Sequence, residues 1–100
     1  MVDGPVVLSV VIEAVPGREE DLAAQLQALV APTQSEAGCM QYKLHRSPEN
    51  PGTFLFYEKF INQAALDAHL ETPHFQGFVK YRDGNDPIAN QNVMRWLPLA

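Results

Sequence analysis

The sequence predicts an α+β fold of the ferredoxin-like type, in which helices cover one face of a four-stranded antiparallel sheet. Strand-like and helical patterns follow one another in the order β-α-β-β-α-β, which is the split unit of that fold. Turn-forming residues separate these segments, and a chain of 100 residues suffices for a single hydrophobic core. We therefore expect one domain over residues 1–100, with its core between about residues 6 and 97.

The first strand and the first helix account for the N-terminal part of the chain. Residues 6–15 form an almost continuous apolar run rich in β-branched side chains, which is typical of a strand covered on both faces. Pro16 and Gly17 end this run, and the acidic residues 19–21 then stand where a helix N-terminus favours negative charge. Pro32 ends or kinks the helix. The buried face of this helix is expected to comprise Leu22, Leu26, Leu29 and Val30.

Two further strands form a predicted hairpin in the middle of the chain. Residues 39–46 and residues 53–61 are rich in apolar and aromatic side chains, and residues 47–52 between them are dense in turn formers. Alternate residues of a strand point to the same face, so one face of the first of these two strands is apolar. That face carries Met40, Tyr42 and Leu44.

The C-terminal part of the chain supplies the second helical region and the last strand. Asn62 is a suitable N-cap for a helix that runs to about Leu70. Thr72 and Pro73 then begin a short helical segment, as its cap and its first-turn proline. The remaining predicted elements are a loop at residues 82–87 and a last strand at residues 93–99.

The third strand places one acid among aromatic rings. Glu58 shares its face of the strand with three phenylalanines, because side chains alternate between the two faces. A carboxylate in such surroundings loses hydration, so its pKa rises unless a cation or hydrogen-bond donors compensate. Glu58 is therefore a candidate proton-transfer group beside a wall that suits an aromatic substrate, and the alternative is a structural acid paired with a basic residue. The three phenylalanines are Phe54, Phe56 and Phe60.

The predicted sheet has more apolar surface than two helices can cover. The strands at residues 6–15 and 53–61 are apolar on both faces, whereas the helices cover only one. An exposed apolar sheet is an association surface. We therefore expect a homodimer with two-fold symmetry that packs through its sheets, with a cavity between helices and sheet or near the dimer seam.

The composition excludes several classes of function. The net charge is -5 and the seven basic residues are scattered, so there is no basic stripe for nucleic acid. The apolar runs are far shorter than the roughly 20 residues that span a bilayer, and the N-terminal residues do not form a signal peptide. Cys39 is the only cysteine, which suits a reducing compartment. We expect a cytoplasmic protein that binds neither nucleic acid nor membrane.

The sequence carries no fingerprint of a metal site or of a common cofactor. His69 and His74 are five positions apart with Pro73 between them, so they lack the i, i+4 spacing of a helical ligand pair. His74 is expected at the surface or as a capping residue. There is no glycine-rich phosphate loop, nucleophile elbow, or flavin or nicotinamide motif. We expect no metal and no cofactor.

Several short motifs occur together in a familiar order along the chain. They resemble those of the antibiotic biosynthesis monooxygenase domain family, which includes quinol monooxygenases, and the resemblance runs from about residue 6 to residue 97. Family members often carry a tryptophan where this chain has Phe60. The motifs are residues 16–20, Glu36-Ala37-Gly38-Cys39 with Tyr42, Tyr57-Glu58-Lys59-Phe60, residues 62–69, and Pro73-His74-Phe75.

The resemblance implies a dimeric ferredoxin-like fold, also described as a dimeric α+β barrel. It also implies, as in many members, oxygenation of an anthrone, a quinol or a similar aromatic molecule by O2 without metal or flavin. Similar domains include haem-degrading enzymes and isomerases that act on a phosphorylated sugar. The asparagine, tryptophan and histidine of the haem-degrading branch have no matching set here, so haem oxygenation is not expected.

His69 is the leading candidate for the proton acceptor, because an imidazole gains and loses a proton near neutral pH. Its predicted helical face meets the sheet, so we expect it to reach Glu58. The alternative is a core histidine that holds helix to strand through a hydrogen bond to a carboxylate. Trp96 is expected to form part of a ring-binding wall or to fill the dimer seam, and Arg95 is expected to be a surface arginine, with the holding of an anionic group as the alternative. The predicted substrate-binding residues are Tyr42, Tyr57, Phe56, Phe60, Phe75, Phe78 and Trp96.

Three hypotheses for function remain open from the sequence. The first is a cofactor-independent monooxygenase, in which proton abstraction makes a quinol or anthrone electron-rich enough to react directly with O2. The second is an isomerase or tautomerase, in which the same base moves a proton within a small carbonyl compound. The third is a dimeric module that binds a hydrophobic metabolite without turnover, in which Glu58 and His69 form a structural pair.

Overall fold

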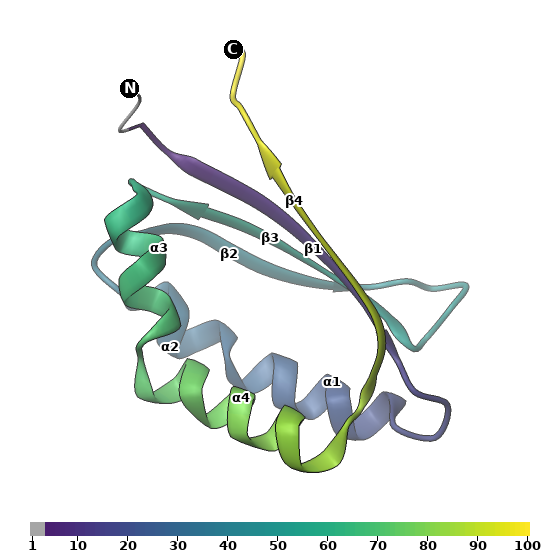
Figure 1. The fold of residues 1–100 in the computed structure, drawn as a ribbon. Helices are drawn as coiled ribbons and strands as arrows, with labels where there is room; N and C mark the ends of the chain where they lie inside the picture. Colours follow the sequence, from purple (N-terminus) through teal and green to yellow (C-terminus); the bar gives the residue numbers. More distant parts are fainter. Residues whose placement is uncertain (1–3) are drawn as a thin grey trace.

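The computed structural model describes residues 4–100 of the chain, and its ribbon shows helices packed on one side of a curved sheet (Figure 1). Strands and helices follow in the predicted β-α-β-β-α-β order, with each helical region divided into two helices. The elements are β1 (Val6–Ala14), α1 (Glu19–Ala28), α2 (Val30–Gln34), β2 (Cys39–Arg46), β3 (Thr53–Phe60), α3 (Gln63–Leu70), α4 (Pro73–Asn85) and β4 (Ile88–Trp96).

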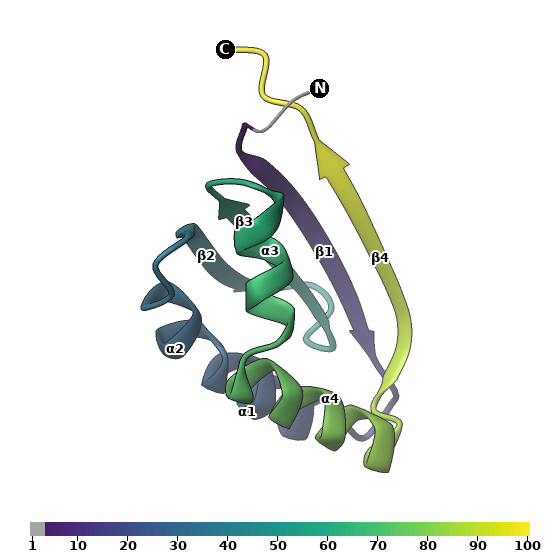
Figure 2. The same cartoon turned by 60° about the vertical axis from the view of Figure 1, so that its left-hand side comes forward.

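The four strands form one antiparallel sheet in the order β2-β3-β1-β4. The inner strand β1 places Leu8 opposite Glu58 of β3 on one side and opposite Arg95 of β4 on the other. Turning the molecule shows all four helices on the same face of the sheet, with β4 at the uncovered edge (Figure 2). The predicted ferredoxin-like α+β fold is confirmed.

The C-terminal boundaries differ from the prediction. Helix α4 continues to Asn85, through residues that the sequence suggested were a loop. It ends because Asp86 adopts the left-handed conformation (φ 49°) and donates its N–H to the Arg82 carbonyl, after which Pro87 cannot continue the helix. Strand β4 begins at Ile88, earlier than predicted, because pairing with β1 orders a polar segment that has no strand pattern of its own.

The first helical region is interrupted before its proline rather than at it. Helix α1 ends at Ala28 and α2 begins at Val30, with Leu29 between them. Pro32 lies within α2, and because proline has no N–H it cannot donate to the carbonyl of Ala28. The two caps expected in the second region are present: Asn62 accepts the N–H of Ala65 (2.9 Å) and Thr72 accepts that of Phe75 (3.3 Å).

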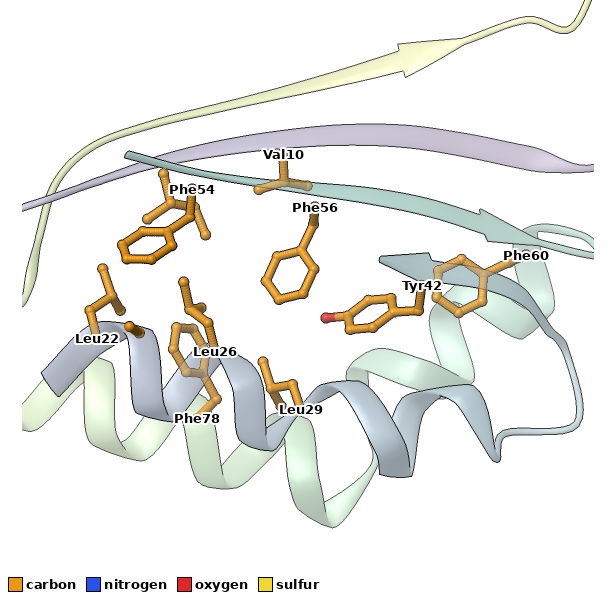
Figure 3. Close-up of a cluster of buried hydrophobic side chains, with 11 residues drawn as sticks. Val10, Leu22, Leu26, Leu29, Tyr42, Phe54, Phe56, Phe60 and Phe78 are labelled. Carbon is orange, nitrogen blue, oxygen red and sulfur yellow. The ribbon is translucent and has the colours of Figure 1, made fainter. Parts of the chain in front are cut away.

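The hydrophobic core lies between the sheet and the helices (Figure 3). Side chains from β1, β2 and β3 point down from the sheet, and α1 and α4 supply the facing residues. This layer accounts for the helical periodicity of α1 and for the aromatic residues of β3. The core includes Val10, Ile12, Leu22, Leu26, Leu29, Tyr42, Phe54, Phe56, Phe60 and Phe78.

The opposite face of the sheet carries apolar side chains that no element of residues 4–100 covers. Register places Val11 beside Leu55, Ser9 beside both Tyr57 and Met94, and Val7 beside Trp96. Met94 and Trp96 are 43% and 49% exposed. We call this surface the outer sheet face. No helix among residues 4–100 has the length and hydrophobicity to cross a membrane.

A pair of glycine substitutions tests the packing of α3 on the start of β2. A Cβ atom at Gly38 would clash with the Cβ of Ala65, so Gly38→Ala forces α3 away from the sheet. We expect a loss of about 1–3 kcal/mol in the free energy of unfolding, measured by urea denaturation.

Gly77 in α4 is the matched control, because a Cβ there meets nothing within 4 Å. Gly77→Ala should leave the fold intact and raise the free energy of unfolding by about 0.5–1 kcal/mol through helix propensity. Equal stability of Gly38→Ala and the wild type would contradict the close approach of α3 to the residues before β2.

Candidate active site

Glu58 points inward from β3 into the layer between sheet and helices, as predicted. Glu58 is only 7% exposed, and the three phenylalanines that share its face of the strand are also buried. Within residues 4–100 no side chain or backbone group donates a hydrogen bond to its carboxyl group. Burial, and to a lesser extent the nearby Glu36 carboxylate, raises the pKa of Glu58 to about 7.

A cavity of about 250 Å³ lies beside Glu58, between the sheet and helices α1, α3 and α4. It is larger than the roughly 150 Å³ apolar cavity that accepts benzene, so a small ring system fits. Most of its wall is apolar, which favours a hydrophobic ligand. The apolar wall comprises Leu8, Val10, Ile12, Leu26, Leu29, Phe56, Leu66, Leu70, Phe75, Phe78 and Val93. The polar or ionisable lining residues are Tyr42, Glu58, His69, Arg82 and Gln91.

His69 reaches this cavity from α3 and is 1% exposed. Its ring packs between those of Phe60 and Phe75, at centroid distances of 5.1 and 5.0 Å. The position of His69 on the inner face of its helix is therefore confirmed. The expected hydrogen bond to Glu58 does not form, because Glu36 supplies the partner: His69 Nδ1 lies 2.8 Å from Glu36 Oε2.

Glu36 joins two histidines that come from different helices. It lies in the loop before β2, and its Oε2 atom is also 2.6 Å from Nε2 of His74 at the start of α4. His74 is half-buried, so the expectation of a surface or capping residue is not met. Burial increases along this cluster, from 22% exposed for the His74 side chain to 14% for Glu36 and 2% for His69.

The shared carboxylate oxygen fixes which nitrogen of His69 carries a proton. A carboxylate accepts hydrogen bonds, so Nδ1 of His69 and Nε2 of His74 are assigned as N–H donors to Glu36. A neutral His69 then holds its lone pair on Nε2. The cluster thus leaves one basic nitrogen of a cavity-lining imidazole available to accept a proton.

The same three residues offer possible metal-ligand atoms within 4.8 Å of one another, although their sequence spacing gave no sign of this. A metal ion at about 2.0–2.2 Å from each ligand keeps neighbouring ligand atoms about 3 Å or more apart. The observed 2.8 and 2.6 Å separations are shorter and are ordinary for hydrogen bonds to a carboxylate. We therefore describe Glu36, His69 and His74 as a hydrogen-bonded cluster.

Tyr42 brings a hydroxyl group to the same region from β2. It pairs with Glu58 across the strands, and its ring packs on that of Phe56 at 4.7 Å (Figure 3). Burial, and then the charge of Glu58, raise the pKa of Tyr42 well above its usual range. The phenol therefore stays protonated and can donate a hydrogen bond to a ligand oxygen.

Three residues predicted to bind substrate do not line this cavity. Tyr57 alternates with Glu58 along β3 and therefore lies on the outer sheet face. Trp96 lies on the same outer face, where its Nε1–H donates to Ser9 Oγ (2.8 Å). Phe60 is fully buried beneath His69, as part of the core rather than of the cavity wall. The predicted residues that the cavity brings together are Tyr42, Phe56, Glu58, His69, Phe75 and Phe78.

Sequence reasoning missed Arg82 and Gln91, which line the cavity from α4 and β4. Both positions belonged to segments without a predicted helix or strand, so no periodicity assigned them a face. Arg95, considered for an anionic group, instead donates from Nη1 to Gln63 Oε1 (2.8 Å) and is not among the lining residues.

Comparison with known proteins gives a consistent family match. The family described as "Antibiotic biosynthesis monooxygenase" matches residues 5–81. "Putative monooxygenase YcnE" of Bacillus subtilis is 38% identical over 74 residues, which cover 74% of this chain and 78% of that protein. The crystal structure of PA3566 from Pseudomonas aeruginosa is 35% identical, with a TM-score of 0.91, and the match covers 100% of this chain and 99% of that one.

A third relative is longer than this chain. "Uncharacterized protein sll1783" of Synechocystis is 37% identical over 78 residues, which cover 78% of this chain. This chain spans only 53% of the length of that relative.

The raised pKa of Glu58 predicts that stability falls as the pH rises through neutrality. Between pH values near 4.5 and 7 the folded chain keeps a proton on Glu58 that the unfolded chain has lost. Relative to Glu58→Gln, the wild type should lose on the order of 3 kcal/mol of unfolding free energy between about pH 4.5 and pH 8. Urea denaturation of both proteins across this range measures the difference.

Glu49→Gln is the control, because this side chain is exposed in the turn between β2 and β3. It should follow the wild type at every pH. A constant difference between the wild type and Glu58→Gln would show that folding does not raise the pKa of Glu58.

Proposed function

The chain belongs to the antibiotic biosynthesis monooxygenase family, and we propose that it oxidises a quinol, an anthrone or a similar aromatic molecule with O2 and without a cofactor. The observation that carries this proposal is the buried His69 imidazole, held by Glu36 with its free nitrogen beside an apolar cavity. The family membership is a finding, whereas the activity, the substrate and the partners of the whole protein are proposed.

The proposed reaction begins with a proton transfer from the substrate to Nε2 of His69. The resulting anion is electron-rich and forms a carbon–oxygen bond with O2, and the proton returns to give a hydroperoxide. Removal of a second proton from the same carbon then breaks the O–O bond. One oxygen atom remains as a carbonyl and the other leaves as water, so the substrate supplies all four electrons.

Glu36 is proposed as a positioning residue for this base. Its carboxylate accepts the Nδ1–H of His69, which orients the ring and stabilises the imidazolium that forms when Nε2 gains a proton. His74 donates to the same oxygen and helps to hold Glu36 in place. The carboxylate and both rings are largely shielded from water, which strengthens their electrostatic interaction.

Glu58 and Tyr42 are proposed to bind the oxygen of the substrate. With a pKa of about 7, Glu58 is protonated in a large fraction of molecules at neutral pH and can donate a hydrogen bond. The Tyr42 phenol supplies a second donor. Two donors near a developing enolate or phenolate oxygen stabilise its negative charge. Phe56, Phe75 and Phe78 are proposed to hold the ring.

We also propose that the protein is a cytoplasmic homodimer that packs through the outer sheet face. Met94 and Trp96 are the large exposed residues of that face, and burying them with Val11 and Leu55 would remove apolar area from water. The single cysteine, Cys39, suits a reducing compartment.

Oxygen consumption tests the proposed chemistry. Metal-free wild type should consume O2 and release a product that keeps one of its oxygen atoms, which is the quinone from an anthrone and the hydroxyquinone from a quinol. His69→Gln should lower kcat by about 10²–10⁴-fold, because it removes the base. Glu36→Gln should lower kcat less, because the ring keeps a hydrogen-bond partner but loses the charge that stabilises the imidazolium.

Tyr57→Phe is the matched control, because Tyr57 lies on the outer sheet face. It should retain nearly full activity. Turnover that continues without O2 would favour an isomerase, and full oxygenase activity in His69→Gln would rule out His69 as the base. Absence of turnover with every anthrone and quinol tested would favour a binding module.

Sedimentation equilibrium tests the proposed dimer. The wild type should sediment as two copies of the 11.1 kDa chain. Met94→Glu should weaken association by at least about tenfold, because it buries a charge in an apolar interface. Gln27→Glu adds the same charge on α1, away from the sheet, and should remain dimeric. A monomeric wild type, or a Met94→Glu protein that dimerises normally, would exclude this interface.

A further inference from the structure

The cavity has one strongly cationic side chain, which has no part in the proposed proton transfer. Arg82 is the only lysine or arginine among the cavity-lining residues of the described chain. It belongs to the last turn of α4, close to where the chain turns into β4 (Figure 2). Its side chain is 37% exposed, so it stands between the cavity and solvent.

Arg82 and Gln91 together form the boundary of the cavity. Both residues line the cavity beside Glu58, and both also line a second, more open hollow with Asp83, Asp86 and Ile88. Because both residues line both hollows, they stand where the two hollows adjoin. We call Arg82 and Gln91 the cavity mouth.

The guanidinium of Arg82 has unused hydrogen-bonding capacity. Its Nε–H donates to Asp83 Oδ1 at 3.2 Å, which occupies one edge of the group. Within residues 4–100 the structure gives neither Nη atom a hydrogen-bond partner. These atoms carry N–H groups in the planar geometry that suits a carboxylate, and the side-chain amide of Gln91 adds a neutral donor and acceptor.

We propose that Arg82 and Gln91 form a subsite that binds a carboxylate, or a similar singly charged oxygen group, on the substrate. The wall between the mouth and Glu58 is apolar, so a ligand that spans the cavity has a hydrophobic ring system with an acidic group at its outer end. This proposal rests on the proposed function in one respect, namely that the substrate binds in this cavity.

The charges around the mouth favour a single negative charge over a phosphate. Asp83 and Asp86 line the open hollow beside Arg82, and Glu58 lines the cavity farther in. Asp83 already pairs with the Nε edge of the guanidinium, so only its two Nη groups remain for one ligand oxygen group, and the neighbouring acids repel a doubly charged phosphate more strongly than a carboxylate. Arg82 therefore distinguishes aromatic acids from both neutral aromatics and phosphorylated compounds.

Equilibrium binding of two isosteric probes tests this subsite without requiring turnover. The probes are 2-naphthoate and the neutral 2-naphthamide, which differ in charge at nearly constant shape. The wild type should bind 2-naphthoate about tenfold more tightly at low ionic strength, as titration calorimetry measures. Arg82→Met should abolish this preference while it leaves the affinity for 2-naphthamide within about twofold.

Arg95→Met is the matched control, since it removes a guanidinium from β4 that does not line the cavity. It should keep the preference for 2-naphthoate, and Arg82→Lys should keep part of it because the charge remains. Circular dichroism checks that each variant is folded. The subsite is excluded if the wild type binds both probes equally or binds neither. It is also excluded if Arg82→Met keeps the preference for 2-naphthoate.

The outcome of this binding experiment does not depend on the outcome of the oxygen-uptake experiment. A preference that depends on Arg82 in a protein without oxygenase activity would support the subsite and reject the proposed reaction. Oxygenase activity in a protein without that preference would do the reverse.

Discussion

A carboxyl group enclosed between a sheet and its helices loses most of its hydration, and this cost shapes the surroundings of Glu58. The fold supplies no cation or hydrogen-bond donor from residues 4–100 to offset it, and burial therefore raises the pKa to about 7. A protonated carboxyl is the form that such a site tolerates. The same burial that makes Glu58 unfavourable as an ion makes it available as a hydrogen-bond donor at neutral pH.

Glu36 and Glu58 lie near one cavity but interact with their surroundings differently. Glu36 accepts hydrogen bonds from His69 and His74, whereas Glu58 has no donor among residues 4–100. The negative charge of Glu36 in turn disfavours a second charge on Glu58. These different partners suit different roles, with Glu36 orienting a base and Glu58 acting as a hydrogen-bond donor.

The sequence predicted those parts of the molecule that depend on local periodicity. Alternation along β3 placed Glu58 on the core face, helical spacing placed His69 toward the sheet, and the caps at Asn62 and Thr72 follow from side-chain chemistry. The pairing of His69 with Glu36 was beyond this reasoning. It depends on how a loop residue meets a helix 33 positions later, and no periodic pattern encodes that contact.

The cavity mouth was missed for a related reason. Arg82 belongs to helix turns that are mostly polar, and Gln91 to a strand whose order comes from pairing with β1. Their faces are set by tertiary contacts rather than by their own sequence.

The geometry of His69 bears on whether it is a structural or a reactive residue. A histidine that only joined helix to sheet would use its ring nitrogens for contacts within the protein, whereas a reactive one keeps a nitrogen open to a ligand. Here Nδ1 is bonded to Glu36, and Nε2 has no hydrogen-bond partner within residues 4–100. The ring is also fixed by Phe60 and Phe75, so its orientation does not depend on a second hydrogen bond. A ligand with an acidic proton in the cavity would supply the missing partner.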